Sequence, residues 1–194
     1  MGLAHAACYG RPLSDAEADA IRSMKRRIET ERLRPDERHT DLKLGHGGLS
    51  DIEFTTQLMQ MQHGALCPAV RVPGTLAALQ ALAERDLIHP PDATRLSACY
   101  ALLSGVRNRL ALLTGQPMDV FPRDARRARA LAIEMGSADT SEGRAEETLR
   151  GFVTAHMQET RRIVDKLFYD TGRAAPPHAT GATRDQARRQ QPDA

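Results

Sequence analysis

The sequence predicts an all-helical bundle of about six helices, and three observations lead to this fold class. Apolar residues recur at the spacing of a helical stripe through most of the chain. Prolines and glycines mark several of the expected helix ends. The 194 residues contain no tryptophan and few aromatic residues, a composition that suits one helical domain of this length.

The first helix is expected over residues 14–34. Ser14 and Glu17 have the spacing of a capping box, and Pro35 ends the segment. Acidic residues interrupt its many basic ones at spacings that allow pairs within the helix, so we expect a solvated basic face. The apolar stripe consists of Ile21, Met24 and Ile28, and the basic residues are Arg22, Lys25, Arg26, Arg27, Arg32 and Arg34.

The next segment joins a strand-like stretch to a second helix through paired glycines. Residues 41–44 allow one short strand. Ser50 and Glu53 form another capping-box pattern, which predicts a helix over 51–63 closed by Gly64. The same helix start has the spacing of a hydrophobic staple between Leu49 and Phe54.

Four further helices complete the predicted bundle. They are expected over 75–86, over 92–114, from Pro122 in a first turn to Gly136, and over 141–169. The apolar stripe of the last helix is predicted to contain Leu149, Phe152, Val153, His156, Ile163 and Leu167.

The chain divides into three parts by composition. Residues 1–13 form a lead-in, residues 14–170 form the bundle, and residues 171–194 are expected to be a disordered tail. That tail has almost no large apolar side chains to offset the entropy of ordering.

Charge and cysteine content exclude several classes of protein. The formal net charge is +2, which does not indicate a general polyanion-binding protein. The three cysteines are widely spaced and suit a reducing cytoplasm. We find neither a signal peptide nor an apolar run long enough to span a membrane. The tail arginines lack an aromatic stacking platform, so nucleic acid is an unlikely partner.

The histidines and cysteines do not predict a metal site or a nucleophile. None of the seven histidines has a second histidine at helical ligand spacing. His156 lies on an apolar stripe and is expected to be a hydrogen-bonded core residue. Cys99 lies on the core face of its helix and is expected to act as a small apolar residue.

One run, residues 41–54, resembles a signature of the bacterial glutamine synthetase adenylyltransferase family. That signature follows each nucleotidyltransferase domain of the family. The residues that match it are Lys43, Gly47, Gly48, Asp51, Ile52, Glu53 and Phe54.

The resemblance extends over about residues 14–170. Residues 24–29, 106–110 and 160–169 resemble other segments of the family in the same order. Ser50, before the Asp-Ile-Glu sequence, resembles the C-terminal, adenylylating half. The resemblance therefore implies a C-terminal helical module in a cytoplasmic enzyme.

The family transfers AMP from ATP to a tyrosine of glutamine synthetase and regulates nitrogen assimilation, and some members also remove AMP by phosphorolysis. This chemistry implies ATP and Mg²⁺, with the metal held by carboxylates of a Gly-Ser and Asp-x-Asp motif. Gly136 and Ser137 are followed by no Asp-x-Asp. We therefore expect no catalytic or metal-binding residue here, and an inactive chain without an upstream nucleotidyltransferase domain.

The resemblance implies that the signature lies on the nucleotide side of the catalytic cleft. The candidates are Lys43, Gly47, Gly48, Asp51 and Glu53. A purely structural interpretation is also open: the two carboxylates favour the helix start, the glycines serve backbone torsion, and the lysine is simply exposed. Two positions apart on a helix, the carboxylates are not expected to hold a metal pair together.

Four arginines that interrupt apolar stripes are candidates for contact with a protein or phosphate partner. They are Arg107, Arg109, Arg161 and Arg162. The implied partners are glutamine synthetase, the nitrogen-signalling protein PII and the upstream domain. The alternative function is a noncatalytic helical module that binds glutamine synthetase or PII.

Overall fold

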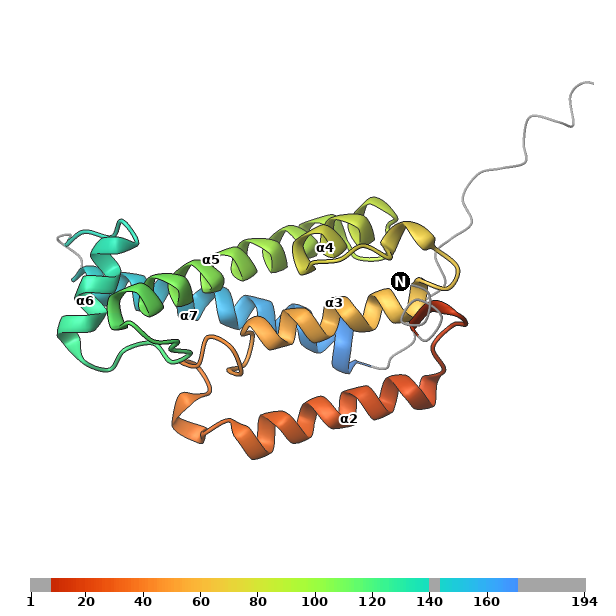
Figure 1. The fold of residues 1–194 in the computed structure, drawn as a ribbon, viewed down its shortest axis with the longest axis horizontal. Coiled ribbons are helices and arrows are strands. Elements are labelled where there is room, and N and C mark those ends of the chain that lie inside the picture. Colours follow the sequence, from red (N-terminus) through yellow and green to blue (C-terminus); the bar gives the residue numbers. More distant parts are fainter. Residues whose placement is uncertain (1–7, 140–143, 171–194) are drawn as a thin grey trace, which may run out of the picture.

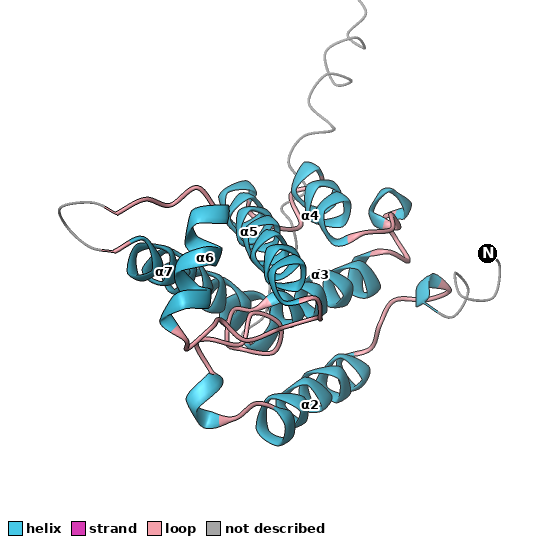
Figure 2. Cartoon of the chain, turned by 60° about the vertical axis from the view of Figure 1, so that its left-hand side comes forward, coloured by secondary structure: helices cyan, strands magenta, loops and turns pink. Residues whose placement is uncertain are grey.

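The computed structural model describes residues 8–139 and 144–170, and this part of the chain contains six α-helices and no strand (Figures 1 and 2). The all-helical prediction is therefore confirmed. Two 3-10 turns, η1 (Pro35–Glu37) and η2 (Pro68–Val70), lie between helices, and a π-helical turn, η3 (Asp165–Tyr169), follows the last one. The helices are α2 (Asp15–Arg32), α3 (Leu49–His63), α4 (Thr75–Glu84), α5 (Pro90–Thr114), α6 (Ala125–Glu134) and α7 (Ala145–Val164).

Three long helices form the body of the bundle. Helix α5 packs along α7, and α3 contacts both of them. Helix α4 covers α3 and α5, while α6 packs on α5 and α7 at the other end of the molecule (Figure 1). Helix α2 lies along the side of α3 and stands apart from the main stack in both views.

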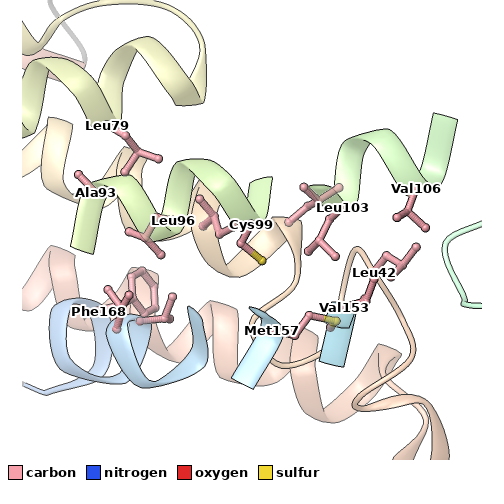
Figure 3. Packing of buried hydrophobic residues seen from close by; sticks show 14 of the residues in the cluster. Leu42, Leu79, Ala93, Leu96, Cys99, Leu103, Val106, Val153, Met157 and Phe168 are labelled. Carbon is pink, nitrogen blue, oxygen red and sulfur yellow. The ribbon is translucent and has the colours of Figure 1, made fainter. Parts of the chain in front are cut away.

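The hydrophobic core lies where α5 faces α7 and the segment before α3. Cys99 and Leu103 project from α5 toward Met157 and Val153 of α7, and Leu96 lies over Phe168 of η3 (Figure 3). All six are almost fully buried. The predicted core position of Cys99 is confirmed, and burial raises the pKa of its thiol to about 11, which keeps it protonated and unreactive near neutral pH.

Helix α2 begins as predicted but attaches to the bundle unexpectedly. The Ser14 hydroxyl accepts from the Glu17 amide, and the Glu17 carboxylate accepts from the Ser14 amide, so the capping box forms. The helix buries Ala18, Arg22 and Lys25. The predicted solvated basic face is therefore wrong for these two cations, because both find partners on other segments.

The predicted short strand over 41–44 does not form. Asp41 makes only an isolated antiparallel bridge with Val120, while the Leu42 amide donates to the Asp119 carbonyl at 2.7 Å. The chain turns immediately afterwards because the Asp41 carboxylate accepts from the amides of Lys43 and Leu44. This Asx-type turn competes with continued extension.

Helix α6 begins later than predicted. Its N-cap is Asp124, whose carboxylate accepts from the Arg127 amide at 2.9 Å. Pro122 lies buried in the preceding loop rather than in the first helical turn. The aspartate cap sets the start because it satisfies an amide that would otherwise lack an intrahelical partner.

The apolar stripe of α7 is centred differently from the prediction. Leu149, Val153 and Met157 follow one another at i, i+4 and are buried. Phe152 is 53% exposed, and His156 is only partly buried, with the two ring centroids 4.2 Å apart. The predicted core role of these two residues is wrong because the stripe runs one position further along the helix. The expected start at 141 and the tail over 171–194 lie outside the described residues.

Candidate functional site at the glycine turn

The glycine turn, residues 41–48, leads directly into α3. The Asp41 carbonyl accepts from the Gly45 amide at 3.0 Å, and the Gly45 carbonyl accepts from the Gly48 amide at 2.8 Å. These bonds fold the chain back, so that the carbonyls of Leu42 and Lys43 lie above the first residues of the helix.

The first amide groups of α3 find their hydrogen-bond acceptors in this turn. The amides of Leu49 and Ser50 donate to the carbonyls of Leu42 and Lys43 at 3.0 and 2.9 Å. The N-cap is Gly48, and Ser50 is buried inside the helix, so the predicted capping box of Ser50 with Glu53 is wrong. The predicted staple fails for the same reason, since Leu49 is already the first helical residue.

Backbone packing accounts for both paired glycines. Gly47 has φ +76°, and a Cβ atom there would overlap the carbonyl oxygen of Met157. A Cβ on Gly48 would lie 3.0 Å from the carbonyl oxygens of Leu42 and Lys43. The turn can therefore lie flat against α7 only with glycine at position 47.

Asp51 lies at the centre of a buried group of charges. Its Oδ1 contacts Lys25 Nζ at 2.5 Å, and its Oδ2 contacts Arg161 Nη1 at 3.1 Å. The Gly47 amide also donates to Oδ2 at 2.7 Å. The Asp51 side chain has no exposed surface, so one carboxylate ties α2, α7 and the glycine turn to the start of α3.

Glu29 completes what we call the charge cluster, which consists of Lys25, Glu29, Asp51, Arg161 and Tyr169. Glu29 Oε1 accepts from Lys25 Nζ at 2.9 Å, Arg161 Nη1 at 3.1 Å and the Tyr169 hydroxyl at 2.7 Å. Lys25 and Arg161 balance the two carboxylates, so the buried charge sums to zero.

The pKa values of the cluster follow from burial and these hydrogen bonds. Burial opposes the charge on Glu29, but hydrogen bonds from Tyr169 and Lys25 outweigh it and lower the pKa of this carboxyl to about 2. Burial and the bond to Glu29 raise the pKa of Tyr169. Burial opposes the charge on Arg161, yet Asp51 and Glu29 raise its pKa. Glu29 and Arg161 therefore remain charged at neutral pH.

The other candidate residues lie apart from this cluster. Lys43 is exposed, and Glu53 accepts from the Tyr100 hydroxyl at 3.2 Å. Arg107 Nε donates to Asp119 at 2.7 Å, and Arg109 Nε to the Glu134 carbonyl at 3.1 Å. Arg162 projects from the surface of α7 and pairs with Glu159 at 3.0 Å.

A family model described as GlnD PII-uridylyltransferase matches residues 22–168. This match covers most of the chain, including the glycine turn and every member of the charge cluster except Tyr169. The chain belongs to this family.

Curated relatives of the chain are named bifunctional glutamine synthetase adenylyltransferase/adenylyl-removing enzymes. The relative from Bifidobacterium longum strain DJO10A is 38% identical over 160 residues, covering 81% of this chain and 14% of the relative. The one from Mycobacterium leprae is 39% identical over 154 residues, covering 76% and 14%. The one from Streptomyces avermitilis is 36% identical over 158 residues, covering 81% and 15%.

These comparisons confirm the resemblance read from the sequence and limit what it establishes. The chain spans about 14–16% of the length of the curated relatives described by these matches. The activity of a whole relative therefore does not follow from this family module alone.

The residues of this family module do not fit a magnesium pair. Asp51 and Glu53 are directed to different partners, Asp51 to two cations and Glu53 to Tyr100. Within residues 8–139 and 144–170, no group of three or more His, Cys, Asp or Glu side chains could hold a metal ion. None of the helices in those ranges is long and apolar enough to cross a membrane.

Sequence reasoning missed three members of the charge cluster: Lys25, Glu29 and Tyr169. Each lay in a segment that resembled the family, but no local pattern indicated its burial. The available signal was a second acidic residue four positions after Lys25, which is compatible with an exposed intrahelical pair as well as with a buried one.

Proposed function

We propose that this chain is the helical module of a glutamine synthetase adenylyltransferase, an enzyme that transfers AMP from ATP to a tyrosine of glutamine synthetase. The names of the curated relatives support this function. The observation that carries it is the glycine turn, fixed in shape by Asp51 at the position of the family signature. A nucleotidyltransferase domain of the same cytoplasmic enzyme supplies the carboxylates that hold Mg²⁺ and ATP.

In this proposal the glycine turn contributes its shape and a positive charge to the nucleotide side of the cleft. The amide N–H groups at the turn and the helix start already donate hydrogen bonds to carbonyl groups and to the Asp51 carboxylate. The turn therefore does not offer an amide cradle of the kind that binds phosphate at many helix starts. Lys43 is exposed at this turn and offsets phosphate charge as a flexible point charge.

Glutamine synthetase and PII are the proposed protein partners of the module. Arg109 and Arg162 are exposed, on α5 and α7. Arg107 is partly exposed beside Asp119. These arginines would contact acidic surfaces of a partner, whereas Arg161 contributes mainly to the charge cluster.

A chimeric enzyme tests the catalytic proposal. Residues 14–170 of this chain would replace the matching segment of the Mycobacterium leprae relative, and transfer of label from α-labelled ATP to glutamine synthetase would be measured with Mg²⁺. We expect transfer by the chimera. Lys43→Gln should lower kcat/KM roughly tenfold, because a charge that stabilises the phosphoryl groups is lost.

The matched control is Lys166→Gln, which removes an exposed lysine that pairs with Asp92. It should leave kcat/KM unchanged. A folded chimera without activity would contradict the proposed role of the module. Equal effects of the two substitutions would contradict the placement of Lys43 at the nucleotide, and labelling by the isolated chain would show that it contains catalytic groups of its own.

A noncatalytic interaction module is the second candidate function. Its specific support is that the carboxylates of Asp51 and Glu53 are already bonded to side chains of this chain, whereas several arginines are exposed. Calorimetry of the isolated chain with glutamine synthetase and with PII tests this function. Binding by the isolated chain, together with an inactive chimera, would favour the interaction module over the catalytic one.

A further inference from the structure

We propose that a surface pocket beside the glycine turn binds a small oxyanion of the phosphate class. The anion pocket has a volume of about 220 Å³ and is lined by His39, His46, Gln158, Arg161 and Arg162. The lining residues come from the loop after α2, from the glycine turn and from the outer side of α7. This site goes beyond the proposed function, which places Lys43 at the nucleotide and assigns no small-molecule ligand to these five residues.

The lining of the anion pocket suits an anion because of its hydrogen-bonding groups. Each of the five side chains carries an N–H donor, and none carries a carboxylate. A guanidinium group offers paired donors that match the oxygens of phosphate. The volume is below the range of pockets that enclose drug-sized ligands, so it suits a single phosphate group rather than a whole nucleotide.

Arg161 is held ready for such a ligand by its other contacts. Its Nη1 binds Glu29 and Asp51, and its Nε binds Asp165 at 2.8 Å. Within residues 8–139 and 144–170 Nη2 has no hydrogen-bond acceptor, although the guanidinium is fixed by its Nη1 and Nε contacts. An anion that binds at Nη2 would therefore meet a donor whose orientation has already been set.

His46 adds a second fixed donor. Its amide donates to the Arg38 carbonyl at 2.9 Å, and its ring lies edge to face with that of His39, with centroids 6.2 Å apart. Burial, and then the nearby Arg161, lower the pKa of His46. The imidazole is therefore neutral near pH 7.5 and donates through one nitrogen.

Two carboxylates that pair with the lining arginines limit which anions bind. Glu159 pairs with Arg162, and Asp165 pairs with Arg161. An incoming anion must compete with Glu159 for Arg162, whose side chain is 76% exposed. A dianion with several acceptor oxygens competes better than chloride, so the site should discriminate in favour of phosphate.

Histidine NMR of the full 194-residue chain tests the anion pocket. Sodium phosphate would be titrated into protein at pH 7.5 and constant ionic strength, with sodium chloride as the comparison salt. We expect the ring signals of His39 and His46 to move saturably with phosphate. The pKa of His46 should also rise, because a bound dianion favours the imidazolium against Arg161 and Arg38 and adds to the charges of Glu29 and Asp51.

Arg162→Gln should weaken phosphate binding at least threefold, roughly the effect of losing one charged hydrogen bond at a solvent-exposed rim. The matched control is Arg127→Gln, because Arg127 is also exposed on a helix but lies outside the anion pocket. Shifts that grow linearly, equal shifts in chloride, or equal binding by the Arg162→Gln and wild-type chains would overturn the proposal.

A parallel titration with magnesium-free ATP distinguishes the source of the phosphate. Tighter saturable binding of ATP at the same histidines would assign the terminal phosphate of a nucleotide. Binding of phosphate without ATP would assign free orthophosphate. Both outcomes support the anion pocket. Neither depends on adenylyl transfer, so an inactive chimera would leave this test unaffected.

Discussion

At the scale of single residues, Asp51 determines how the candidate site is held. Its carboxylate is fully buried and contacts two cations and one amide. A buried ion pair adds little stability compared with an apolar replacement of both partners, but removal of one partner leaves the other charge uncompensated. The position therefore requires a carboxylate for as long as Lys25 and Arg161 are present.

We predict that Asp51→Asn lowers the free energy of unfolding by about 3 kcal/mol, because it leaves Glu29 as the single carboxylate of the cluster facing two cations, Lys25 and Arg161. Urea unfolding followed by circular dichroism measures this change. Glu53→Gln is the control, two positions along the same helix, and should cost about 1 kcal/mol or less because only one hydrogen bond from Tyr100 is altered. Equal losses would contradict the central role of Asp51.

Gly47 provides a second prediction at this scale. Gly47→Ala should cost about 3 kcal/mol, since the added methyl group meets the Met157 carbonyl in addition to a left-handed backbone. Gly115→Ala separates the two effects. Its φ is +70° but a Cβ there meets nothing within 4 Å, so about 1 kcal/mol is expected. Thermal unfolding measures the loss of stability in each variant. Similar losses would show that the left-handed backbone torsion, and not the contact with Met157, causes the destabilisation.

The burial of a residue was predictable from the sequence only where it depends on the helical spacing of apolar residues. Cys99 belongs to an apolar stripe, and its core position follows from that stripe. Lys25 is 1% exposed, yet the same periodicity treats a lysine as a surface residue. Its burial depends on Asp51, which comes from another helix, and no spacing within α2 contains that information.

At the scale of elements, α2 is attached to the bundle mainly by polar groups. Two of its three buried residues are cations, and Arg22 Nε donates to the Phe168 carbonyl at 2.6 Å. Most helices in globular proteins are held by an apolar face. The attachment of α2 should therefore respond to pH more strongly than that of the other helices.

We predict that acid weakens this attachment through Glu29. The folded pKa of about 2 lies below the usual value, so its contribution is present above the unfolded pKa and is lost as pH falls toward 2. Between pH 6 and pH 3 the loss should be about 2 kcal/mol. Urea unfolding at several pH values measures it. The loss should become smaller in Glu29→Gln, and an unchanged pH dependence would contradict this assignment.

The two capping boxes show which element boundaries the sequence specifies. At Ser14 the pattern is local, the preceding chain is free of other bonds, and the box forms as predicted. At Ser50 the same pattern fails because the carbonyls of Leu42 and Lys43 accept hydrogen bonds from the first amides of the helix. A folded turn that supplies these acceptors is a tertiary feature, and it overrides the local capping preference.

At the scale of the whole molecule, the bundle has a compact body and a more weakly attached helix. Helices α3, α4, α5 and α7 share the hydrophobic core. Helix α2 contributes only Ala18 to the fully buried apolar residues. Regions with few buried apolar contacts open locally at a lower free energy than the core.

Hydrogen exchange should detect this difference. We predict that the amides in the middle of α2 exchange with a lower opening free energy than those in the middle of α5, which buries Leu96, Leu103 and Leu110. Native-state exchange by mass spectrometry measures both helices in one sample. Equal protection would mean that the charge cluster attaches α2 as firmly as apolar packing would.

The fold class was predictable because helical periodicity and composition are properties of the whole chain. The family signature also located the glycine turn correctly. The anion pocket was not predictable as a unit, because His39, His46 and Gln158 come from separate segments and carry no shared pattern. Arg161 and Arg162 were singled out, but only the folded structure separates the buried role of the first from the exposed role of the second.

The charge cluster has a consequence for the order of events during protein synthesis. Asp51 is made early, whereas Arg161 and Tyr169 are among the last residues of the described bundle. Before these segments leave the ribosome, Asp51 lacks Arg161, Glu29 lacks Arg161 and Tyr169, and the glycine turn has no α7 to lie against. The site is therefore assembled only after nearly the whole bundle has left the ribosome, which makes its completion a late, long-range step of folding.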